Sequence, residues 1–378
     1  MKEAIQKDEF GPEYVIDVYD PRAGMEGFLV IDNTALGLGK GGIRMTPNVT
    51  REEVSRLARA MTFKNAIAGI PFGGAKAGMI WKGGSTAQKK KAVVAFAKAI
   101  KYFIPHLYVA GPDVNSGERE MQWIAEAVEC WQAATGKPSS YCYKKEGKLM
   151  CGLPHELGST GFGVAIATRV ALPFRGIEMK GATCAIDGFG NVGSFAFLYL
   201  HQMGARIVAV SDKEGAIYKK EGLDGSVLNN LKKKGKSVIS YPGATAISHT
   251  QLFHLPVDVL IPASVTDVIH EKNQQGVKAK IIVQGANIPM QEHIEERLVK
   301  RGILIVPDIV ANAGGVISSY AEYKGYSADH MRKLVKEKIE KSVEAVLKVS
   351  EKNQKNPRDV ARDIAMNCIR SAMRKKRL

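Results

Sequence analysis

Residues 181–212 read GATCAIDGFGNVGSFAFLYLHQMGARIVAVSD, and the order of apolar runs and glycines in this stretch decides the expected fold. The run ATCAI (182–186) predicts a strand, and the turn GFGNVG (188–193) opens a helix with the pattern SFAFLYLHQM. ARIVAVSD (205–212) predicts a second strand. This order is typical of a dinucleotide-binding unit, whose glycines permit a tight turn, a close approach of the backbone to the pyrophosphate, and helix packing.

The residues after the glycine turn bear on the choice of cofactor. Asp212 ends the second expected strand 19 residues after Gly193, where an acid hydrogen-bonds the ribose 2′-hydroxyl of NAD. A glycine-rich turn without a ligand would not explain this acid. Lys213 would neutralise the 2′-phosphate of NADP, so both cofactors stay open. The candidate contacts from this stretch are Gly188, Gly190, Val192, Gly193, Asp212 and Lys213.

Short apolar runs that end in small residues continue the pattern toward the C-terminus. They are VDVLIPAS (257–264), AKIIVQGAN (279–287) and ILIVPDIVANAGG (303–315). Such runs alternating with helices predict a parallel sheet covered on both faces. The chain has 378 residues, 45% of them apolar, and single cores stop growing at roughly 250–300 residues. We therefore expect an α/β protein of two domains separated by a cleft.

The expected domains divide near residue 150. Residues 151–345 should form a Rossmann-like NAD(P)-binding domain. Residues 1–150 should form an α/β substrate-binding and oligomerisation domain, with the C-terminal helix 346–378 packing back on it. The elements predicted elsewhere are a strand at 26–36, helices at 50–69 and 85–103, a linker or cofactor-facing loop at 137–158, and two amphipathic helices in the last 50 residues. Thr50 and Glu53 predict a capping box at the first helix.

The formal charge of +16 admits several kinds of partner. The lysine runs at 89–91, at 232–236 and near the C-terminus are far apart and carry no interleaved aromatics, which disfavours nucleic-acid binding and leaves anionic small molecules or a lysine-rich surface. No apolar run approaches the roughly 20 residues needed to span a bilayer. Residues 1–15 have no signal-peptide pattern, so we expect a cytoplasmic protein without a membrane partner.

The cysteines predict neither a metal site nor a disulfide framework. They are five in number, scattered, without a CxxC pair and without a histidine at metal-ligand spacing. We expect free, buried or half-buried thiols at Cys130, Cys142, Cys151, Cys184 and Cys368.

The stretch PFGGAKAGM (71–79) sets Lys76 among small residues, which is unusual for a charged side chain. Lys40 in GLGKGGIRM and Lys64 in MTFKNAIAG have similar surroundings, and Asp113 in VAGPDVNSG is flanked by turn formers. Singly, Lys40 and Asp113 fit turn residues, and Lys64 fits a helix lysine with a buried stem. Together they suggest two lysines that hold the carboxylates of an acidic substrate, while a third with a depressed pKa does acid–base chemistry beside a carboxylate.

A series of motifs resembles the amino-acid dehydrogenase superfamily of glutamate, leucine, phenylalanine and valine dehydrogenases. The motifs are GGIRM, MTFKNAIAGIPFGGAKAG, GPDV, STGFG, GFGNVG, VDVLIPAS, QGANIP and PDIVANAGGVISSY, all in the order of the family. The resemblance covers nearly the whole chain after residue 15 and is strongest to glutamate dehydrogenase. It implies the reversible, NAD- or NADP-dependent oxidative deamination of L-glutamate to 2-oxoglutarate and ammonium, without a metal and in a homo-oligomer.

The resemblance also implies roles for single residues. Lys76 would activate water for attack on the iminium carbon, Asp113 would transfer protons at the amino nitrogen, and Lys64 would bind the α-carboxylate. Lys40 and Ser319 would hold the side-chain carboxylate, and Gly41 and Val316 would belong to the same substrate site. The further cofactor contacts that it implies are Thr160, Asn191, Asn287 and Asn312.

Two sets of observations favour different substrates. A buried Lys40 facing a methyl-ended side chain would be unpaired at a cost of several kcal/mol, so Lys40 and Ser319 favour a dicarboxylate. The short segment before GGIRM and the stretch YDPRAGMEGFLVIDNTALG (19–37) resemble the leucine branch instead. A dehydrogenase for leucine, valine or phenylalanine is therefore the alternative. A nucleic-acid-binding protein and a catalytically silent relative remain as well, although Lys76 and Asp113 together argue against the latter.

Overall fold

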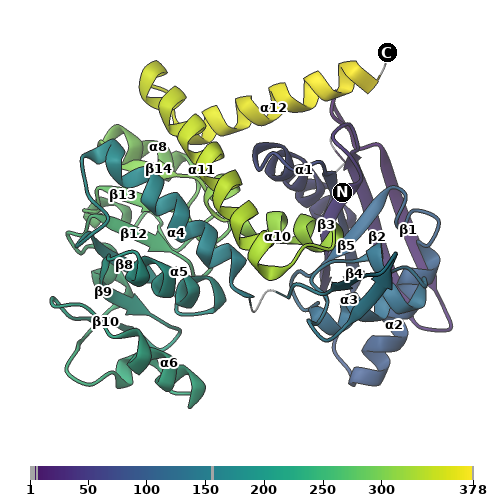
Figure 1. Cartoon of the computed structure of the whole chain (residues 1–378), viewed down its shortest axis with the longest axis horizontal. Helices are drawn as coiled ribbons and strands as arrows, with labels where there is room; N and C mark the ends of the chain where they lie inside the picture. The colour runs from purple at the N-terminus through teal and green to yellow at the C-terminus, as the bar shows by residue number, and fades with distance from the viewer. Residues whose placement is uncertain (1–4, 6, 155–156, 377–378) are drawn as a thin grey trace. The chain divides into compact units, whose positions relative to one another are not determined.

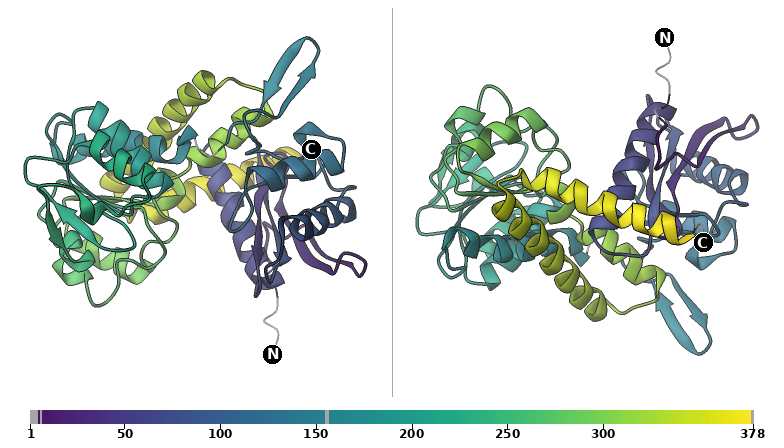
Figure 2. Two further views of the ribbon diagram at one scale, coloured as in Figure 1. Left: turned by 90° about the horizontal axis from the view of Figure 1, so that it is seen from below. Right: turned by 90° about the horizontal axis from the view of Figure 1, so that it is seen from above.

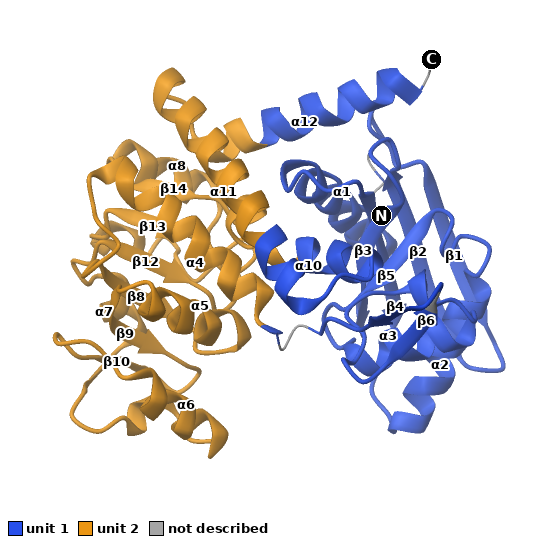
Figure 3. Cartoon of the chain, in the orientation of Figure 1, with its two compact units in different colours: residues 1–157, 316–334, 362–378 blue, residues 158–315, 335–361 orange. Residues whose placement is uncertain are grey.

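The computed structural model describes residues 5, 7–154 and 157–376. The chain forms two compact units: unit 1 takes in residues 1–157, 316–334 and 362–378, and unit 2 takes in residues 158–315 and 335–361. Figure 3 colours them separately. The α/β class and the two-part organisation agree with the prediction, but the boundaries differ. The first crossing falls after residue 157 rather than 150, and each unit draws on part of the expected C-terminal segment.

Unit 1 is built on a five-stranded mixed sheet of order β1-β2-β4-β3-β5 (Figure 1). β1, β2 and β4 pair antiparallel, whereas β3 lies parallel to both β4 and β5. The strands are β1 Tyr14–Asp20, β2 Met25–Asn33, β3 Gly39–Thr46, β4 Gly73–Ile80 and β5 Tyr108–Gly111. The strand expected at residues 26–36 is β2. The parallel arrangement brings the carboxyl ends of β3, β4 and β5 to the same edge of the sheet.

Helices cover both faces of this sheet. α1 (Arg51–Ile67) packs through Val54 and Ala58 on Val30, and α2 (Thr86–Ala99) and α3 (Glu118–Ala127) join the larger core on the opposite face. Both expected helices are confirmed. The Thr50 hydroxyl accepts the Glu53 N–H at 3.1 Å, as a capping box requires. The Glu53 carboxylate instead accepts a hydrogen bond from Arg44 at 2.6 Å, which a local sequence pattern could not indicate.

The prediction of a linker or cofactor-facing loop at 137–158 is wrong for its central part. The chain forms a hairpin of β6 (Cys142–Lys145) and β7 (Lys148–Cys151) that extends from the rest of unit 1 (Figure 2). The turn residues Glu146 and Gly147 both have positive φ, as a two-residue hairpin turn requires. His155 and Glu156 lie outside the described residues.

The hairpin also corrects the prediction for two cysteines. Its register sets Cys142 opposite Cys151, and the two form a disulfide with a Cα–Cα distance of 4.1 Å. Sequence spacing alone did not reveal this pair because the strands were not recognised. Cys130, Cys184 and Cys368 are free, as predicted, but Cys368 is exposed rather than buried or half-buried.

Unit 2 contains a seven-stranded sheet of order β11-β10-β9-β8-β12-β13-β14. β9, β8, β12, β13 and β14 are mutually parallel, and the short β10 and β11 add antiparallel strands at one edge. The strands are β8 Thr183–Asp187, β9 Arg206–Ser211, β10 Ala216–Tyr218, β11 Thr245–Ile247, β12 Val259–Pro262, β13 Ile281–Val283 and β14 Leu304–Val306. The predicted parallel sheet is confirmed, and its strand order reverses at β8. In such sheets ligands bind at the carboxyl ends beside the reversal.

Helices lie on both faces of this sheet as well. Leu252 and Phe253 of α7 and Ile294 and Leu298 of α8 pack on one face, and α4 and α5 pack together on the other. The helices of the unit are α4 Ser159–Ala171, α5 Asn191–Gln202, α6 Gly225–Lys233, α7 His249–Phe253, α8 Glu292–Lys300 and α9 Asp308–Ala311.

Three helices complete the chain: α10 (Gly314–Tyr323), α11 (Ala328–Asn353) and α12 (Pro357–Lys376). The last two are the amphipathic helices expected at the C-terminus. Tyr320 and Tyr323 of α10 stand edge-on to the Phe72 ring, with centroids 5.6 and 5.3 Å away. This aromatic packing explains why residues 316–334 belong to unit 1. Within the described ranges, no helix combines the length and the apolar character that a membrane crossing requires.

Candidate active site

A cluster of charged residues lies at the carboxyl ends of the parallel strands in unit 1. The Lys76 ammonium on β4 is 3.1 Å from Oδ2 of Asp113, which follows β5. Arg44 on β3 donates its Nε–H to the same oxygen at 2.9 Å. Oδ1 of Asp113 accepts no hydrogen bond from any described side chain. The sheet thus brings together Lys76 and Asp113, as predicted, and adds Arg44, which was quoted only as part of the motif GGIRM.

Burial decides the electrostatics of this cluster. Lys76 is only 5% exposed, and burial lowers the pKa of its ammonium; Arg44 lowers it further, while Asp113 opposes both effects. Burial would raise the pKa of Asp113, but Lys76 and Arg44 hold it below its ordinary value. The result is a buried carboxylate beside a lysine that gives up its proton more easily than a lysine in water.

The glycines around Lys76 have a structural reason. A Cβ on Gly74 would lie 2.0 Å from the Thr62 hydroxyl oxygen and 2.3 Å from the Thr62 backbone nitrogen. A Cβ on Gly41 would lie 1.7 Å from the Ala75 carbonyl oxygen. Both glycines therefore allow close approach of the protein's own backbone: α1 to β4, and β3 to β4. The predicted place of Gly41 in the substrate site is a separate matter and stays a prediction.

Lys40, the next residue of interest on β3, is 3% exposed. Its ammonium donates to the Ala110 carbonyl at 2.8 Å. Among the residues that the structure describes, no carboxylate lies within 4 Å of it. Gly111 makes room for the ammonium, because a Cβ there would lie 2.4 Å from Nζ. Burial lowers the pKa of Lys40 to about 7, and the Glu322 carboxylate opposes this effect.

The other predicted substrate residues also belong to unit 1. Lys64 is half-buried near the end of α1, and its neighbour Asn65 donates to the Gly73 carbonyl at 2.6 Å, which ties this turn of α1 to the start of β4. Val316 and Ser319 are half-buried on α10. The Ser319 hydroxyl makes no hydrogen bond to a described residue. Its helix is held by the aromatic contacts to Phe72, just before the strand of Lys76.

The glycine turn of unit 2 has the geometry that the sequence predicts. Gly188 has φ +94°, and its N–H donates to the Ser211 hydroxyl at 2.8 Å. A Cβ on Gly193 would lie 1.8 Å from the Gly188 carbonyl oxygen, so only glycine lets α5 approach β8. A Cβ on Gly190 would meet nothing within 4 Å. Open space at the second glycine is what a pyrophosphate needs there.

Asp212 lies at the end of β9, where the sequence places it, but its carboxylate already has several partners. It accepts hydrogen bonds from the Glu214 and Val238 N–H groups at 2.9 and 2.7 Å and from the Ser237 hydroxyl at 2.9 Å. Burial would raise the pKa of Asp212, but these donors hold it below its ordinary value. Its predicted contact to a ribose therefore competes with bonds inside the chain.

The Asp212 loop and the glycine turn border one cavity of about 810 Å³ at this edge of the sheet. Lys213 and Lys236 are exposed at its rim, and no hydrogen bond or ion pair to a described residue occupies either ammonium. The volume falls within the range of small-molecule sites. The lysine run 232–236, interpreted from the sequence as dispersed surface charge, thus contributes to a candidate binding site.

The four remaining predicted cofactor residues all lie in unit 2. Asn312 donates to Asn287 Oδ1 at 2.9 Å. Thr160 is the second residue of α4, and a Cβ on Gly314 would lie 3.2 Å from the Thr160 Cα. A Cβ on Gly161 would lie 2.5 Å from the Val192 carbonyl oxygen, which places the start of α4 against the start of α5. Asn191 is the first residue of α5.

Sequence analysis missed two residues at this edge. Asp187 ends β8 and is 3% exposed. It accepts hydrogen bonds from the Ser211 hydroxyl at 2.8 Å and from the Ser264 hydroxyl, and so ties the ends of β9 and β12 to its own strand. Lys232 on α6 donates to the Gly190 carbonyl at 3.0 Å and to the Ser194 hydroxyl at 2.8 Å. The position of Asp187 directly before the turn was the one available signal.

No group of three or more His, Cys, Asp or Glu side chains suited to a metal occurs within residues 5, 7–154 and 157–376. The two candidate sites thus consist of a lysine-rich cluster in unit 1 and a glycine turn with a cavity in unit 2.

Comparison with known proteins identifies both halves of the chain. Residues 12–130 match the family described as Glu/Leu/Phe/Val dehydrogenase, dimerisation domain, and residues 152–377 match Glutamate/Leucine/Phenylalanine/Valine dehydrogenase. The second match alone covers more than half of the chain.

Individual relatives agree with these matches. Glutamate dehydrogenase of Thermotoga maritima is 36% identical over 93% of this chain and 86% of its own length. The NADP-specific glutamate dehydrogenase of Saccharolobus shibatae is 34% identical over 96% and 89%. A solved structure of hetero-hexameric glutamate dehydrogenase from Thermus thermophilus matches with a TM-score of 0.82 and 27% identity over 97% of this chain and 90% of that one. Relatives named NAD-specific occur as well.

Proposed function

Because the chain belongs to the glutamate/leucine/phenylalanine/valine dehydrogenase family, we propose that it catalyses the reversible oxidative deamination of L-glutamate. Glutamate, water and NAD(P)⁺ give 2-oxoglutarate, ammonium, NAD(P)H and a proton. The proposal is supported by relatives named glutamate dehydrogenase, of which one is named NADP-specific and another NAD-specific. A dehydrogenase for leucine, valine or phenylalanine is the less supported alternative.

The observation that carries the choice of glutamate is the state of Lys40. A buried ammonium needs an anion or several acceptors, and here it has one backbone carbonyl. The side-chain carboxylate of glutamate supplies the missing charge, with Ser319 as a further donor and Gly41 and Val316 in the same region. An apolar side chain would leave the ammonium unpaired. Lys64 holds the α-carboxylate.

Lys76 and Asp113 carry out the proton transfers. Oδ2 of Asp113 is shared by Lys76 and Arg44, while Oδ1 is free to take a proton from the substrate amino group. Lys76 in its neutral form takes a proton from the water that attacks the α-carbon once it is an iminium carbon. The lowered pKa of Lys76 supports this role, since a general base works best with a pKa near the working pH.

The residues of the glycine turn fit the cofactor that the family implies. The open space at Gly190 and the start of α5 suit a pyrophosphate, and the cavity beside Asp212 suits the adenosine ribose. NAD(P)⁺, when bound, accepts a hydride from the substrate α-carbon. Asn191 and Val192, which begin α5, would lie beside the pyrophosphate. Thr160, Asn287 and Asn312 would hold the part of the cofactor beyond it, and Lys213 would face a 2′-phosphate.

The test is turnover by the purified protein, followed by NAD(P)H absorbance with glutamate, leucine, valine and phenylalanine, each with NAD and with NADP. Turnover of glutamate above the others is expected. Preferred turnover of an apolar amino acid would move the chain to the leucine branch, and no turnover with any pair would favour a silent relative. The assembly of this chain as a homo-oligomer and its location in the cytoplasm belong to the same proposal.

A further inference from the structure

Unit 1 contains a second buried ion pair, which the proposed reaction does not use. Lys137 and Glu322 are both fully buried, and the Lys137 ammonium lies 2.6 Å from Glu322 Oε1. Lys137 also donates to the Ala134 carbonyl and lies over the Trp131 ring, 3.8 Å from its centroid. Taking two charges out of water is costly, and a hydrophobic pair of the same size would do as well for stability. The pair therefore calls for a functional explanation.

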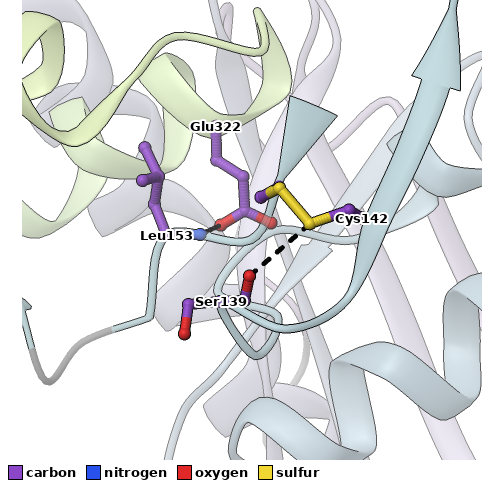
Figure 4. Close-up of a disulfide and its surroundings, with 5 residues drawn as sticks. Ser139, Cys142, Leu153 and Glu322 are labelled. Atoms are coloured by element: carbon purple, nitrogen blue, oxygen red, sulfur yellow. Dashed lines mark hydrogen bonds between the residues drawn. A yellow bond between two sulfur atoms is a disulfide. The ribbon is translucent and has the colours of Figure 1, made fainter. Parts of the chain in front are cut away.

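Glu322 is held rigidly by the chain around it. Its Oε2 accepts the Gly136 N–H at 2.7 Å and the Leu153 N–H at 2.9 Å. Figure 4 shows the Leu153 bond, next to the hairpin that the Cys142–Cys151 disulfide closes. Both ends of the segment 136–153 are thus fastened to one carboxylate. Glu322 stands on α10 three residues after Ser319, about one helical turn away.

The same ion pair acts on Lys40. Of the charged groups that affect Lys40, the Glu322 carboxylate favours its charged form, whereas Lys137 and Lys76 disfavour it. The Lys76 charge is largely offset by Asp113, 3.1 Å away. Tyr108 on β5 donates its hydroxyl to the Gly41 carbonyl and stays neutral, because burial raises its pKa. Lys64 on α1 is a further half-buried cation of unit 1. The Ala110 carbonyl that accepts the Lys40 ammonium also accepts the Thr135 N–H at 3.0 Å, and the next residue, Gly136, donates to Glu322 at 2.7 Å. These contacts place the Glu322 carboxylate close to Lys40, where it offsets the burial of the ammonium.

We propose that Glu322 and Lys137 are positioning residues for the dicarboxylate end of the substrate site. Glu322 keeps the buried Lys40 ammonium charged and ready for a substrate carboxylate. Lys137 holds Glu322 in place and partly cancels the electrostatic effect of the Glu322 carboxylate on Lys40. The pair thereby determines over which pH range the site accepts a dicarboxylate. The inference rests on the proposed function for the identity of the substrate, but its test does not depend on turnover.

The test measures the binding of glutarate, a dicarboxylate without the reacting amino group, by calorimetry between pH 6 and 9. The proteins compared are the wild type, Glu322→Gln, Lys137→Met and the double variant. In the wild type, affinity should fall as rising pH removes the Lys40 proton. Glu322→Gln should move the midpoint of this fall to lower pH and weaken binding at pH 8 by about tenfold, since one pH unit of midpoint corresponds to a factor of ten.

The two single variants distinguish a charge effect from loosened packing. Lys137→Met should leave the midpoint unchanged or raise it, whereas general loosening would move both variants in the same direction. If Glu322→Gln does not fold, the double variant removes both buried charges and keeps similar volumes. Its midpoint should lie below that of the wild type. Three outcomes would overturn the proposal. The first is a double variant with the midpoint of the wild type, and the second is a shift of the midpoint in the same direction in both single variants. The third is a wild type that does not bind glutarate.

Turnover separates this inference from the proposed function. With glutamate as substrate, Glu322→Gln should raise KM and leave kcat within about threefold, because the affected group binds the far end of the substrate. A wild type that binds glutarate with the expected pH dependence but turns over no amino acid would contradict the proposed function and leave the role of Glu322 intact. Normal turnover of glutamate, together with a Glu322→Gln variant whose pH midpoint for glutarate binding is unshifted, would support the proposed function and contradict the role of Glu322.

Discussion

The Lys76 ammonium lies 3.1 Å from Oδ2 of Asp113, and Arg44 occupies the same oxygen at 2.9 Å. Three strands contribute to this arrangement, since Arg44 stands on β3, Lys76 on β4 and Asp113 just after β5. Two cations on one oxygen leave the other oxygen of Asp113 available for a proton. The acid–base chemistry proposed above depends on this asymmetry.

Asp113→Asn should lower kcat for glutamate by about 10²–10⁴-fold, the usual contribution of a positioned acid or base. Lys76→Met should lower kcat by a factor in the same range. Lys89→Met is the matched control, since it breaks a comparable ion pair in unit 1, with Glu120 at 2.9 Å. Steady-state kinetics on the three variants provide the measurement. If Asp113→Asn retained wild-type kcat, Asp113 would not be the proton acceptor.

Lys40→Met should change the substrate preference. The variant removes the buried ammonium that a side-chain carboxylate would neutralise, so kcat/KM for glutamate should fall by about 100-fold, equivalent to about 2.7 kcal/mol. L-Norvaline, in which a methyl group replaces that carboxylate, should lose nothing or gain. The comparison is kcat/KM for both substrates. Equal losses for both would mean that Lys40 does not contact the end of the side chain.

Lys40 should also impose a pH dependence on stability. Its pKa is lowered from 10.5 to about 7 in the folded chain, so between these values the unfolded chain holds a proton that the folded chain has released. The free energy of unfolding therefore rises with pH in this window, by up to about 1.4 kcal/mol per pH unit from this group. Lys40→Met lacks this contribution. Denaturant titrations of both proteins at pH 7 and 9 give the free energy of unfolding of the variant minus that of the wild type. This difference should fall as pH rises, and a constant difference would contradict the lowered pKa.

Two glycines of the same turn should respond differently to alanine. Gly190 has φ −73° and open space where a Cβ would stand, so Gly190→Ala should keep the fold and raise KM for NAD(P) by about tenfold or more. Gly193→Ala forces a Cβ against the Gly188 carbonyl oxygen and should destabilise unit 2 by about 1–3 kcal/mol. Thermal unfolding of both variants measures the effect on stability, and steady-state kinetics with NAD(P) measure the effect on the cofactor KM. Gly190→Ala with unchanged cofactor KM would show that the pyrophosphate binds elsewhere.

Lys213 should distinguish between the two cofactors. Its ammonium is exposed at the rim of the cavity beside Asp212, where it would pair with a 2′-phosphate. Lys213→Ala should raise KM for NADP by about fivefold or more and leave KM for NAD nearly unchanged, since a charged hydrogen bond contributes about 1.5–3 kcal/mol. Lys278→Ala, a lysine away from this cavity, serves as the control. An equal rise for NAD and NADP would assign Lys213 to the shared part of the cofactor.

The sequence by itself determined the class of the fold and most of the reactive groups. The run from residue 181 to 212 predicted β8, the turn, α5 and β9, because strand and helix periods and glycine requirements are local properties. Lys40, Lys64 and Lys76 were singled out for a similar reason, since a lysine flanked by small or apolar residues can be recognised in the sequence alone.

Only the tertiary structure decided how these groups are paired. The ion pairs of Asp113 with Lys76 and Arg44 and of Lys137 with Glu322 join residues that are 37 to 185 positions apart. No local pattern encodes such pairs, because they arise from strand order and helix packing. The Cys142–Cys151 disulfide was missed for a related reason, since its pairing follows from a hairpin register. Whether a lysine is a solvated surface charge or a buried, reactive one depends on burial, and burial is a property of the folded chain.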